Sequence, residues 1–226
     1  MDIGGGTVDG VVFKYVNDKG SRSINFYSAK VEPLGSAVIA NENDVDNPEQ
    51  FEKALLANEL NIGVISRVQE PSRKLQRQVA FVIMTAKQKD GRNWQREFFQ
   101  DRSTRHKTLA RLDPSNSMPL IIFVGGGGAG SPWYQQSILD TYDKFGHWGA
   151  GIPPYDLSEV PKPNDLHTYG LELADFRRFA IAYGLSVPYG EGPDIRLPSQ
   201  FPKEEAVQRR RMRNIVDYHD TKDAYC

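Results

Sequence analysis

The first ten residues contain a dense set of groups that could do chemistry. Two carboxylates flank three consecutive glycines, and a hydroxyl follows the last glycine. The residues are Asp2, Gly4, Gly5, Gly6, Thr7 and Asp9. Glycine lets a ligand approach the main chain closely, and successive N–H groups in such a turn can bind phosphate oxygens. The two acids can hold a hydrated Mg²⁺, which prefers oxygen ligands and keeps several waters. A glycine-rich hairpin with two solvated acids would have the same sequence.

A second glycine-rich stretch lies about 120 residues later. The apolar run 120–124 predicts a buried strand. Four glycines follow, namely Gly125, Gly126, Gly127 and Gly128. A helix should then begin, with Ser131 as its cap and Pro132 in its first turn. Strand, glycine loop and helix in this order are typical of nucleotide binding. The spacing of Gly125, Gly127 and Gly130 also permits a dinucleotide fold and an oxidoreductase.

The remaining chain supplies the elements that must position these two stretches. Residues 11–16 and 23–31 predict strands of a hairpin, with a turn at 18–20. A helix should begin at Pro48, capped by Asn47, with Gln50 reaching back to the cap.

The long segment 71–89 predicts a second helix, because its apolar residues recur at helical spacing. These residues are Leu75, Val79, Ile83 and Ala86. The run 81–84 could instead form a buried strand. The basic run 101–111 fits a solvated helix face. Residues 149–165, rich in glycine and proline, predict a loop, and residues 175–185 predict another helix.

Length and composition limit the domain number, the partners and the compartment to be expected. The chain has 226 residues, enough for one large or two small domains. Its 28 basic residues nearly balance its 29 acidic ones, so charge gives no reason to expect nucleic acid as a partner. No apolar run approaches the roughly 20 residues that a membrane helix needs, so we expect no membrane partner. The single cysteine, Cys226, fits a reducing compartment, and we expect a cytoplasmic protein.

Residues 2–9 resemble the second phosphate motif of the actin-like ATPase superfamily, in the form found in heat-shock chaperones and bacterial actin-like proteins. The strand at 120–124, the glycines after it and Pro132 resemble the adenosine motif of the same superfamily. The two motifs occur in the superfamily's order. The loop of the second motif is about one residue longer than in the chaperones and carries small residues where they have a longer side chain.

The resemblance implies an α/β fold with a ribonuclease H-like lobe, a mixed sheet flanked by helices. Residues 1–40 and 119–226 would form this lobe, with its core at 1–40 and 119–200, and residues 41–118 would form an inserted, mainly helical subdomain. The helix at 175–185 resembles the superfamily's connecting helix between lobes, where Ala180, Ala182 and Gly184 would allow close helix crossing.

The resemblance also implies Mg²⁺ with ATP or ADP as cofactors. Asp2 and Asp9 would hold the Mg²⁺, Thr7 would contact the terminal phosphate, and the glycines of the two motifs with Pro132 would hold the nucleotide. Candidates for contacts to the base are Arg73, Lys74 and Arg77. Because no first phosphate motif precedes residue 2, we expect a C-terminal lobe that needs a separate N-terminal ATPase lobe for hydrolysis. The open inter-lobe face would favour self-association or a protein client. The alternative is a degenerate interaction module that has lost nucleotide binding.

Overall fold

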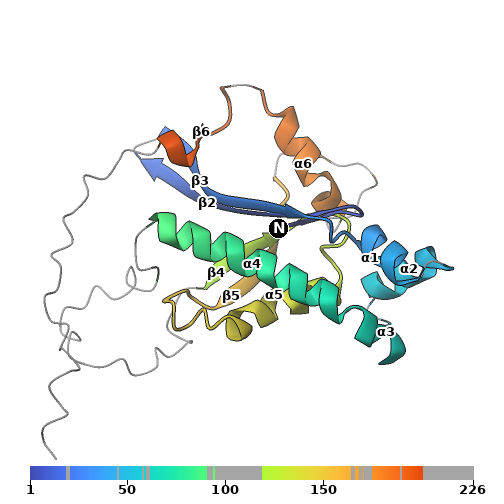
Figure 1. The fold of residues 1–226 in the computed structure, drawn as a ribbon. Helices are drawn as coiled ribbons and strands as arrows, with labels where there is room; N and C mark the ends of the chain where they lie inside the picture. The colour runs from blue at the N-terminus through green and yellow to red at the C-terminus, as the bar shows by residue number, and fades with distance from the viewer. Residues whose placement is uncertain are drawn as a thin grey trace, which may run out of the picture.

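The computed structural model describes residues 1–18, 21–44, 46–57, 59, 62–90, 94, 119–163, 166–167, 170, 175–188 and 190–200. Its elements in chain order are β1 (Asp2–Ile3), β2 (Val8–Asp18), β3 (Ser21–Glu32), α1 (Ser36–Asn43), α2 (Pro48–Ala57), α3 (Ile62–Arg67), α4 (Gln69–Asp90), β4 (Leu120–Val124), α5 (Pro132–Lys144), β5 (Tyr155–Glu159), α6 (Phe176–Ser186), β6 (Asp194–Arg196) and the short 3-10 helix η5 (Pro198–Gln200). The fold is therefore mixed α/β, as the sequence predicts (Figure 1).

The strands form two sheets that meet at one point. The first sheet has the order β1-β2-β3-β6 and the second pairs β4 with β5. A parallel bridge between Asp2 and Gly125 joins them, so β1 and β4 lie side by side and run in the same direction. Along the combined order β6-β3-β2-β1-β4-β5, β2 alone runs opposite to the other described strands. The ends of β1 and β4 therefore place the two glycine loops together.

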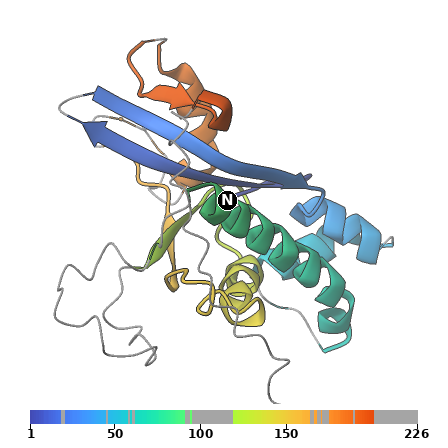
Figure 2. The ribbon, with the colours of Figure 1, turned by 60° about the vertical axis from the view of Figure 1, so that its left-hand side comes forward.

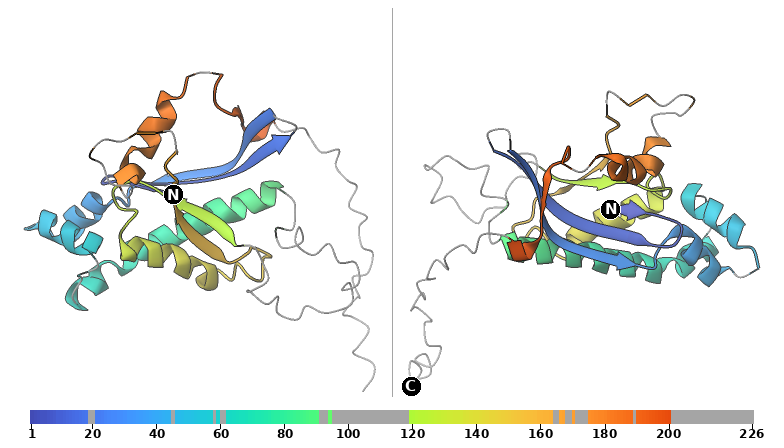
Figure 3. Two further views of the ribbon diagram at one scale, coloured as in Figure 1. Left: turned by 180° about the vertical axis from the view of Figure 1, so that it is seen from behind. Right: turned by 90° about the horizontal axis from the view of Figure 1, so that it is seen from above.

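Helices α4 and α5 cover one face of this sheet (Figures 1 and 3). The apolar residues of α4 at helical spacing are buried, as the sequence predicts. They form one core with Ile3 and Val8 of the β1–β2 hairpin, called the first hairpin below, and with Ile122 and Val124 of β4. Buried Tyr134 of α5 donates its hydroxyl hydrogen to the carbonyl of Leu34, 2.7 Å away, which ties α5 to the end of β3. One core thus supports both glycine loops from the same side.

The opposite face of the sheet is far more open. In the described residues, α6 is the helix on this side, and β2 and β3 extend past it as a long hairpin (Figure 2). Exposed apolar side chains from β2, β4 and α6 remain on this side or on the helix itself: Val11, Phe13, Tyr15, Ile121, Phe123, Phe179, Ile181 and Leu185. The one buried residue of α6 is Phe176. The two faces of the sheet therefore differ sharply in how well they are covered.

Several local predictions are confirmed, with some corrections. Helix α2 begins at Pro48, with Asn47 Nδ2 donating to Gln50 Oε1 over 2.9 Å. The strand at 120–124 and the helices at 71–89 and 175–185 are present, the last two as α4 and α6. The alternative of a strand at 81–84 is wrong, because these residues lie within α4. The loop predicted at 149–165 is wrong in part, because it contains β5.

Some predictions fall on residues that the structure does not describe. These are residues 19–20 of the turn predicted at 18–20, the basic run 101–111 and the part of the predicted lobe from residue 201. The proposed division into a lobe and an inserted subdomain at 41–118 stays a prediction. Helix α4, which belongs to that segment, packs against β2 and β3.

Candidate functional site

The first glycine loop is held by the start of α1. The carbonyls of Gly4, Gly5 and Gly6 accept hydrogen bonds from main-chain amides of residues 35–38 over 3.0–3.3 Å. At the other side of the loop, the amide of Gly4 donates to the carbonyl of Thr7 over 2.9 Å. These bonds fix the loop, although the side of Gly5, Gly6 and Thr7 away from α1 is exposed.

The direction of the carbonyls determines the direction of the amides. In a planar trans peptide, the N–H of one residue points opposite to the C=O of the residue before it. Since the carbonyls of residues 4–6 point to α1, the N–H groups of Gly5, Gly6 and Thr7 point away from it. This arrangement presents three main-chain donors on the exposed side of the turn, which is the geometry that binds anions.

Asp2 and Asp9 lie directly opposite each other at the base of this loop. They are register partners in the β1–β2 pair, next to the pair of Ile3 and Val8. Because Ile3 and Val8 are buried in the helix-covered core, strand alternation places both carboxylates on the opposite, open face. One oxygen of Asp9, Oδ1, is buried and has no hydrogen-bond partner among the described residues.

The electrostatics of this pair are unfavourable. Burial first, and then the neighbouring Asp9 charge, raise the pKa of Asp2 above its ordinary value, and the Met1 amino group opposes this shift. The Met1 amino group donates to the carbonyl of Phe123 over 2.7 Å. Burial lowers its pKa, while both carboxylates oppose that shift. Two adjacent carboxylates, one with an unpartnered buried oxygen, form an arrangement that a cation would stabilise.

The second glycine loop lies against the first hairpin. Gly125 exchanges two main-chain hydrogen bonds with the hairpin, one with Met1 and one with Ile3, each 2.9 Å long. The amide of Gly128 donates to the carbonyl of Ile3, also over 2.9 Å. The structure therefore brings together the two stretches that the sequence singles out.

Two glycines of this loop are required by close packing. Gly126 has φ = 86°, and a Cβ there would lie 2.4 Å from the Ile3 carbonyl oxygen and 2.5 Å from Asp2 Oδ1. A Cβ at Gly128 would lie 2.4 Å from the Ile3 side chain. By contrast, Gly127 is exposed and has no atom within 4 Å of its Cβ position. Only part of the loop is thus open to a ligand.

The helix after the loop begins as predicted, but its cap differs. Ser131 occupies the cap position of α5 and Pro132 its first turn. The Ser131 hydroxyl makes no capping bond and instead donates to the carbonyl of Leu55 over 2.9 Å. Ser131 therefore ties the loop to α2, a role that its position in the sequence did not reveal.

Arg177, from the first turn of α6, is a site residue that sequence reasoning missed. Its carbonyl accepts a hydrogen bond from the amide of Gly126 over 2.9 Å. Its guanidinium packs against Gly130, where a Cβ would lie 2.7 Å from both terminal nitrogens. The side chain is about three-quarters buried, and its Nε is buried without a partner. No local pattern marks Arg177 as a site residue, because α6 meets the loop only through the tertiary fold.

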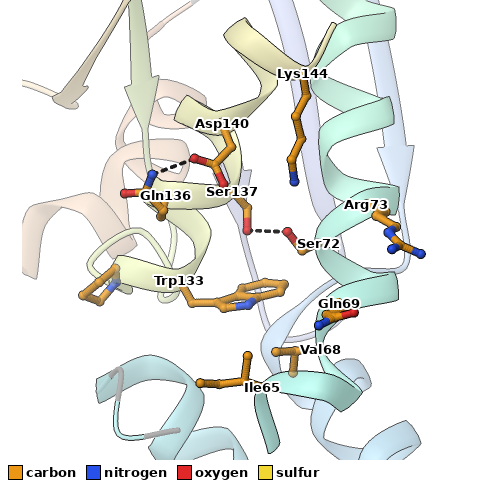
Figure 4. A pocket seen from close by; sticks show the side chains of 11 residues that line it. Ile65, Val68, Gln69, Ser72, Arg73, Trp133, Gln136, Ser137, Asp140 and Lys144 are labelled. Atoms are coloured by element: carbon orange, nitrogen blue, oxygen red, sulfur yellow. Dashed lines mark hydrogen bonds between the residues drawn. The ribbon is translucent and has the colours of Figure 1, made fainter. Parts of the chain in front are cut away.

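A groove of about 720 Å³ lies between α3, α4 and α5 (Figure 4). Trp133 lies across one end beside Ile65 and Val68, and the Ser72 and Ser137 hydroxyls are 2.9 Å apart further along it. Arg73 and Pro132 line this groove. Arg73 and Arg77 each lie 3.8 Å from a carboxylate oxygen of Glu70. Because α4 and α5 cover the face of the sheet opposite to Asp2 and Asp9, the groove is separate from the carboxylate pair.

The predicted site residues therefore divide into groups. The two acids, Thr7 and the glycines of both loops lie in one region at the ends of β1 and β4. Pro132 begins α5 and faces the groove. In the described part of the chain there is no cluster of three or more His, Cys, Asp or Glu side chains that could hold a metal. Within the same residues, no helix has the length and apolar character needed to cross a membrane.

Comparison with known proteins gives no assignment. No model of a known protein family matches the sequence, and no curated protein matches it.

Proposed function

We propose that this chain is an adenine-nucleotide-binding lobe of an actin-like or heat-shock-chaperone-like ATPase, binding Mg-ATP or Mg-ADP at the ends of β1 and β4. The observation that carries the proposal is the unpartnered, buried oxygen of Asp9 beside Asp2, at the base of a loop with three outward main-chain amides. A phosphate with its divalent cation would satisfy the amides and the carboxylates together.

The donor set at this position fits Mg²⁺. This ion is bound in proteins by one or two carboxylates, with waters and phosphate oxygens completing its shell. Asp2 and Asp9 would hold it, directly or through its waters. When bound, the ion would neutralise charge on the phosphates. Thr7, exposed at the end of the loop, would contact the terminal phosphate.

The strand order supports the finer fold assignment in this proposal. The order β3-β2-β1-β4-β5, with β2 alone antiparallel, supports a ribonuclease H-like core. In sheets with parallel strands, ligands bind outside the carboxyl ends of strands where the connections diverge. The chain leaves β1 through a turn into β2 and leaves β4 through a loop into α5, so their shared edge is such a place.

The nucleoside would lie on the exposed part of the second loop. Gly127 is exposed there with open space around it, while Gly126 and Gly128 serve the packing. Phosphoryl transfer depends mainly on positioning and charge stabilisation from all sides of the phosphates. One lobe supplies only part of this cradle, so we expect weak binding and negligible hydrolysis until an N-terminal ATPase lobe completes the site.

Calorimetric titration with Mg-ADP tests the proposal. The wild type should bind, and Asp9→Asn should bind at least about tenfold more weakly, since a charge-assisted contact contributes roughly 1.5–3 kcal/mol. Asp156→Asn is the matched control, because Asp156 is an exposed acid on β5. Equal affinities for the wild type and Asp9→Asn would reject the assigned site.

The open sheet face favours a second candidate, a module that binds another polypeptide. Apolar side chains such as Val11, Phe13 and Phe123 are 39–46% exposed, and Leu185 of α6 is 84% exposed. Large apolar side chains exposed on one face of a protein are a feature of interaction sites. An N-terminal ATPase lobe, a protein client or a second copy of the chain would each cover it.

Sedimentation distinguishes self-association from the other cases. Wild type should associate as its concentration rises, and Ala182→Glu should weaken that association, because Ala182 is exposed on α6. A clean monomer at high concentration would reject self-association. Loss of Mg-ADP binding is not expected from Ala182→Glu, so this test is independent of the nucleotide site.

A further inference from the structure

Arg177 places a cation beside the second glycine loop. Gly130 leaves the space that the guanidinium fills, since a Cβ there would lie 2.7 Å from both terminal nitrogens and 2.9 Å from Cζ. The main chain of Arg177 is bonded to Gly126. The loop therefore accepts this side chain at its Gly130 end and fixes its backbone at the Gly126 end.

The hydrogen-bonding capacity of Arg177 is poorly used. A guanidinium has five N–H donors. Its Nε is buried without a partner in the described residues. Arg177 Nη1 lies 3.5 Å from Glu159 Oε1, beyond the usual length of a hydrogen bond, and the Glu159 side chain is 63% exposed. An ion pair of this length, with one partner exposed, contributes little free energy. A largely buried guanidinium with an unpartnered Nε and one long ion pair has donors left to bind an anion.

The position of Arg177 relates it to the carboxylate pair. Gly125 lies between them, because its Cβ position is 3.7 Å from the Arg177 carbonyl oxygen and 3.9 Å from Asp2 Oδ1. The first turn of α6 therefore borders the region between the carboxylate pair and the exposed part of the second loop. Its phosphates carry the negative charge and the oxygen acceptors that a guanidinium binds in bidentate fashion.

We propose that Arg177 binds a phosphate group of the nucleotide, from the side of the site opposite to the first glycine loop. This inference rests on the proposed function and adds a residue to it. Glu159 is then a competitor that holds the guanidinium when no anion is present.

Binding of three ligands to matched variants tests the role of Arg177. The ligands are Mg-ADP, adenosine and inorganic phosphate, each titrated by calorimetry or NMR. Arg177→Gln should weaken Mg-ADP binding about tenfold or more, the size of effect for losing a charged hydrogen bond, and should leave adenosine binding unchanged. Arg178→Gln is the matched control, since Arg178 is the exposed neighbour on the same helix, and it should change neither.

Glu159→Gln should change the affinity for Mg-ADP in the opposite direction to Arg177→Gln. Removing the competing carboxylate should strengthen Mg-ADP binding by a few-fold, whereas a purely structural ion pair would predict no gain. Arg177→Lys retains the charge without the bidentate donors and should recover part of the lost affinity. This variant keeps the test valid if Arg177→Gln melts much lower than the wild type.

The outcomes separate this inference from the proposed function. If the wild type binds Mg-ADP and Arg177→Gln binds it equally well, Arg177 has no role and only the inference is overturned. If Arg177→Gln weakens adenosine as much as Mg-ADP, Arg177 contacts the base and the phosphate assignment is wrong. If inorganic phosphate alone shows the full Arg177 dependence while adenosine does not bind, the site is a phosphate site and the nucleotide is wrong. If the wild type binds none of the three, both proposals fail.

Discussion

The two glycine loops are similar in composition but differ in what requires their glycines. In the first loop, Cβ positions at Gly5 and Gly6 meet nothing closer than 3.8 Å, and neither residue has a positive φ. In the second loop, Gly126 and Gly128 have atoms of the first hairpin within 2.4 Å of their Cβ positions. Packing alone explains the second pair of glycines. Packing does not explain Gly5 and Gly6 of the first loop, so these two glycines are stronger evidence for close approach of a ligand.

The same difference changes how the site should be tested. A bulky substitution at Gly126 would disrupt the contact between β1 and β4, so lost nucleotide binding would report damage to the fold. Substitutions at Gly6 or Gly127, which have open space around them, report on the ligand itself.

Gly126→Ala should destabilise the protein most. The new Cβ meets the Ile3 carbonyl oxygen at 2.4 Å, and alanine is strained at φ = 86°. Strain and overpacking together should lower the free energy of unfolding by roughly 3–5 kcal/mol. Urea denaturation followed by circular dichroism measures this. A loss below about 0.5 kcal/mol, the usual range for an unconstrained surface position, would show that the two loops are not packed as described.

Gly35→Ala should disturb the packing of the first glycine loop against the start of α1. A Cβ at Gly35 would lie 2.3 Å from the carbonyl carbon and oxygen of Gly5. The loop and the start of α1 must separate, at a cost of about 1–3 kcal/mol. Hydrogen exchange of the amides of residues 36–38 should become faster in the variant. Unchanged exchange would mean that these amides are not held by the loop.

Asp2→Asn should stabilise the protein without ligand at neutral pH, although it removes a proposed cation ligand. The pKa of Asp2 is raised in the folded state. The free energy that Asp2 contributes to stability is therefore fully present below its unfolded pKa of 3.8. It is lost as pH rises through the raised folded-state pKa of Asp2. At neutral pH the gain from the substitution should be a few tenths of a kcal/mol, because the group is partly exposed.

The difference between wild type and Asp2→Asn should grow as pH rises from about 4 to 7. His147 shifts in the other direction, since burial and then Lys87 lower its pKa, so its contribution falls as pH drops below 6.5. Comparing the two proteins at each pH cancels this second group. A difference that is flat with pH, measured by thermal denaturation, would contradict the paired-carboxylate account.

Gly6→Ala should have the smallest effect on stability and a clear effect on binding. Its Cβ position has no atom within 4 Å, so the free energy of unfolding should change by less than about 0.5 kcal/mol. The methyl group would occupy the exposed side of the phosphate loop and should weaken Mg-ADP binding. Gly127→Ala is the companion for the nucleoside side. If neither variant changes binding, the open parts of both loops do not contact the ligand.

The sequence predicted features that depend on local pattern. Pro48 begins α2, Leu75 and Val79 mark the buried face of α4, and Pro132 begins α5, because caps and helical spacing act within a few residues. The sequence did not predict β5, because residues 155–159 lie among glycines and prolines. These residues form a strand by pairing with β4.

The carboxylate pair was predictable as a pair of residues but not as a strained arrangement. Spacing in a short hairpin brings Asp2 and Asp9 together. No local pattern marks the buried, unpartnered oxygen of Asp9. Arg177 contacts Gly126 and Gly130, which lie about 50 residues earlier in the sequence. Long-range packing of this kind has no local signature, so these features required the structure.

Paramagnetic broadening by Mn²⁺ can locate the proposed cation site at Asp2 and Asp9. Mn²⁺ replaces Mg²⁺ at oxygen sites and broadens the NMR signals of nearby amides. In the presence of ADP, low Mn²⁺ should broaden the amides of residues 2–9 and of Gly125 and Gly126 beside Asp2, and leave the Trp133 indole in the α4–α5 groove sharp. Asp9→Asn should abolish the effect. Broadening centred elsewhere, or none in the first hairpin, would contradict a nucleotide-linked cation site at Asp2 and Asp9.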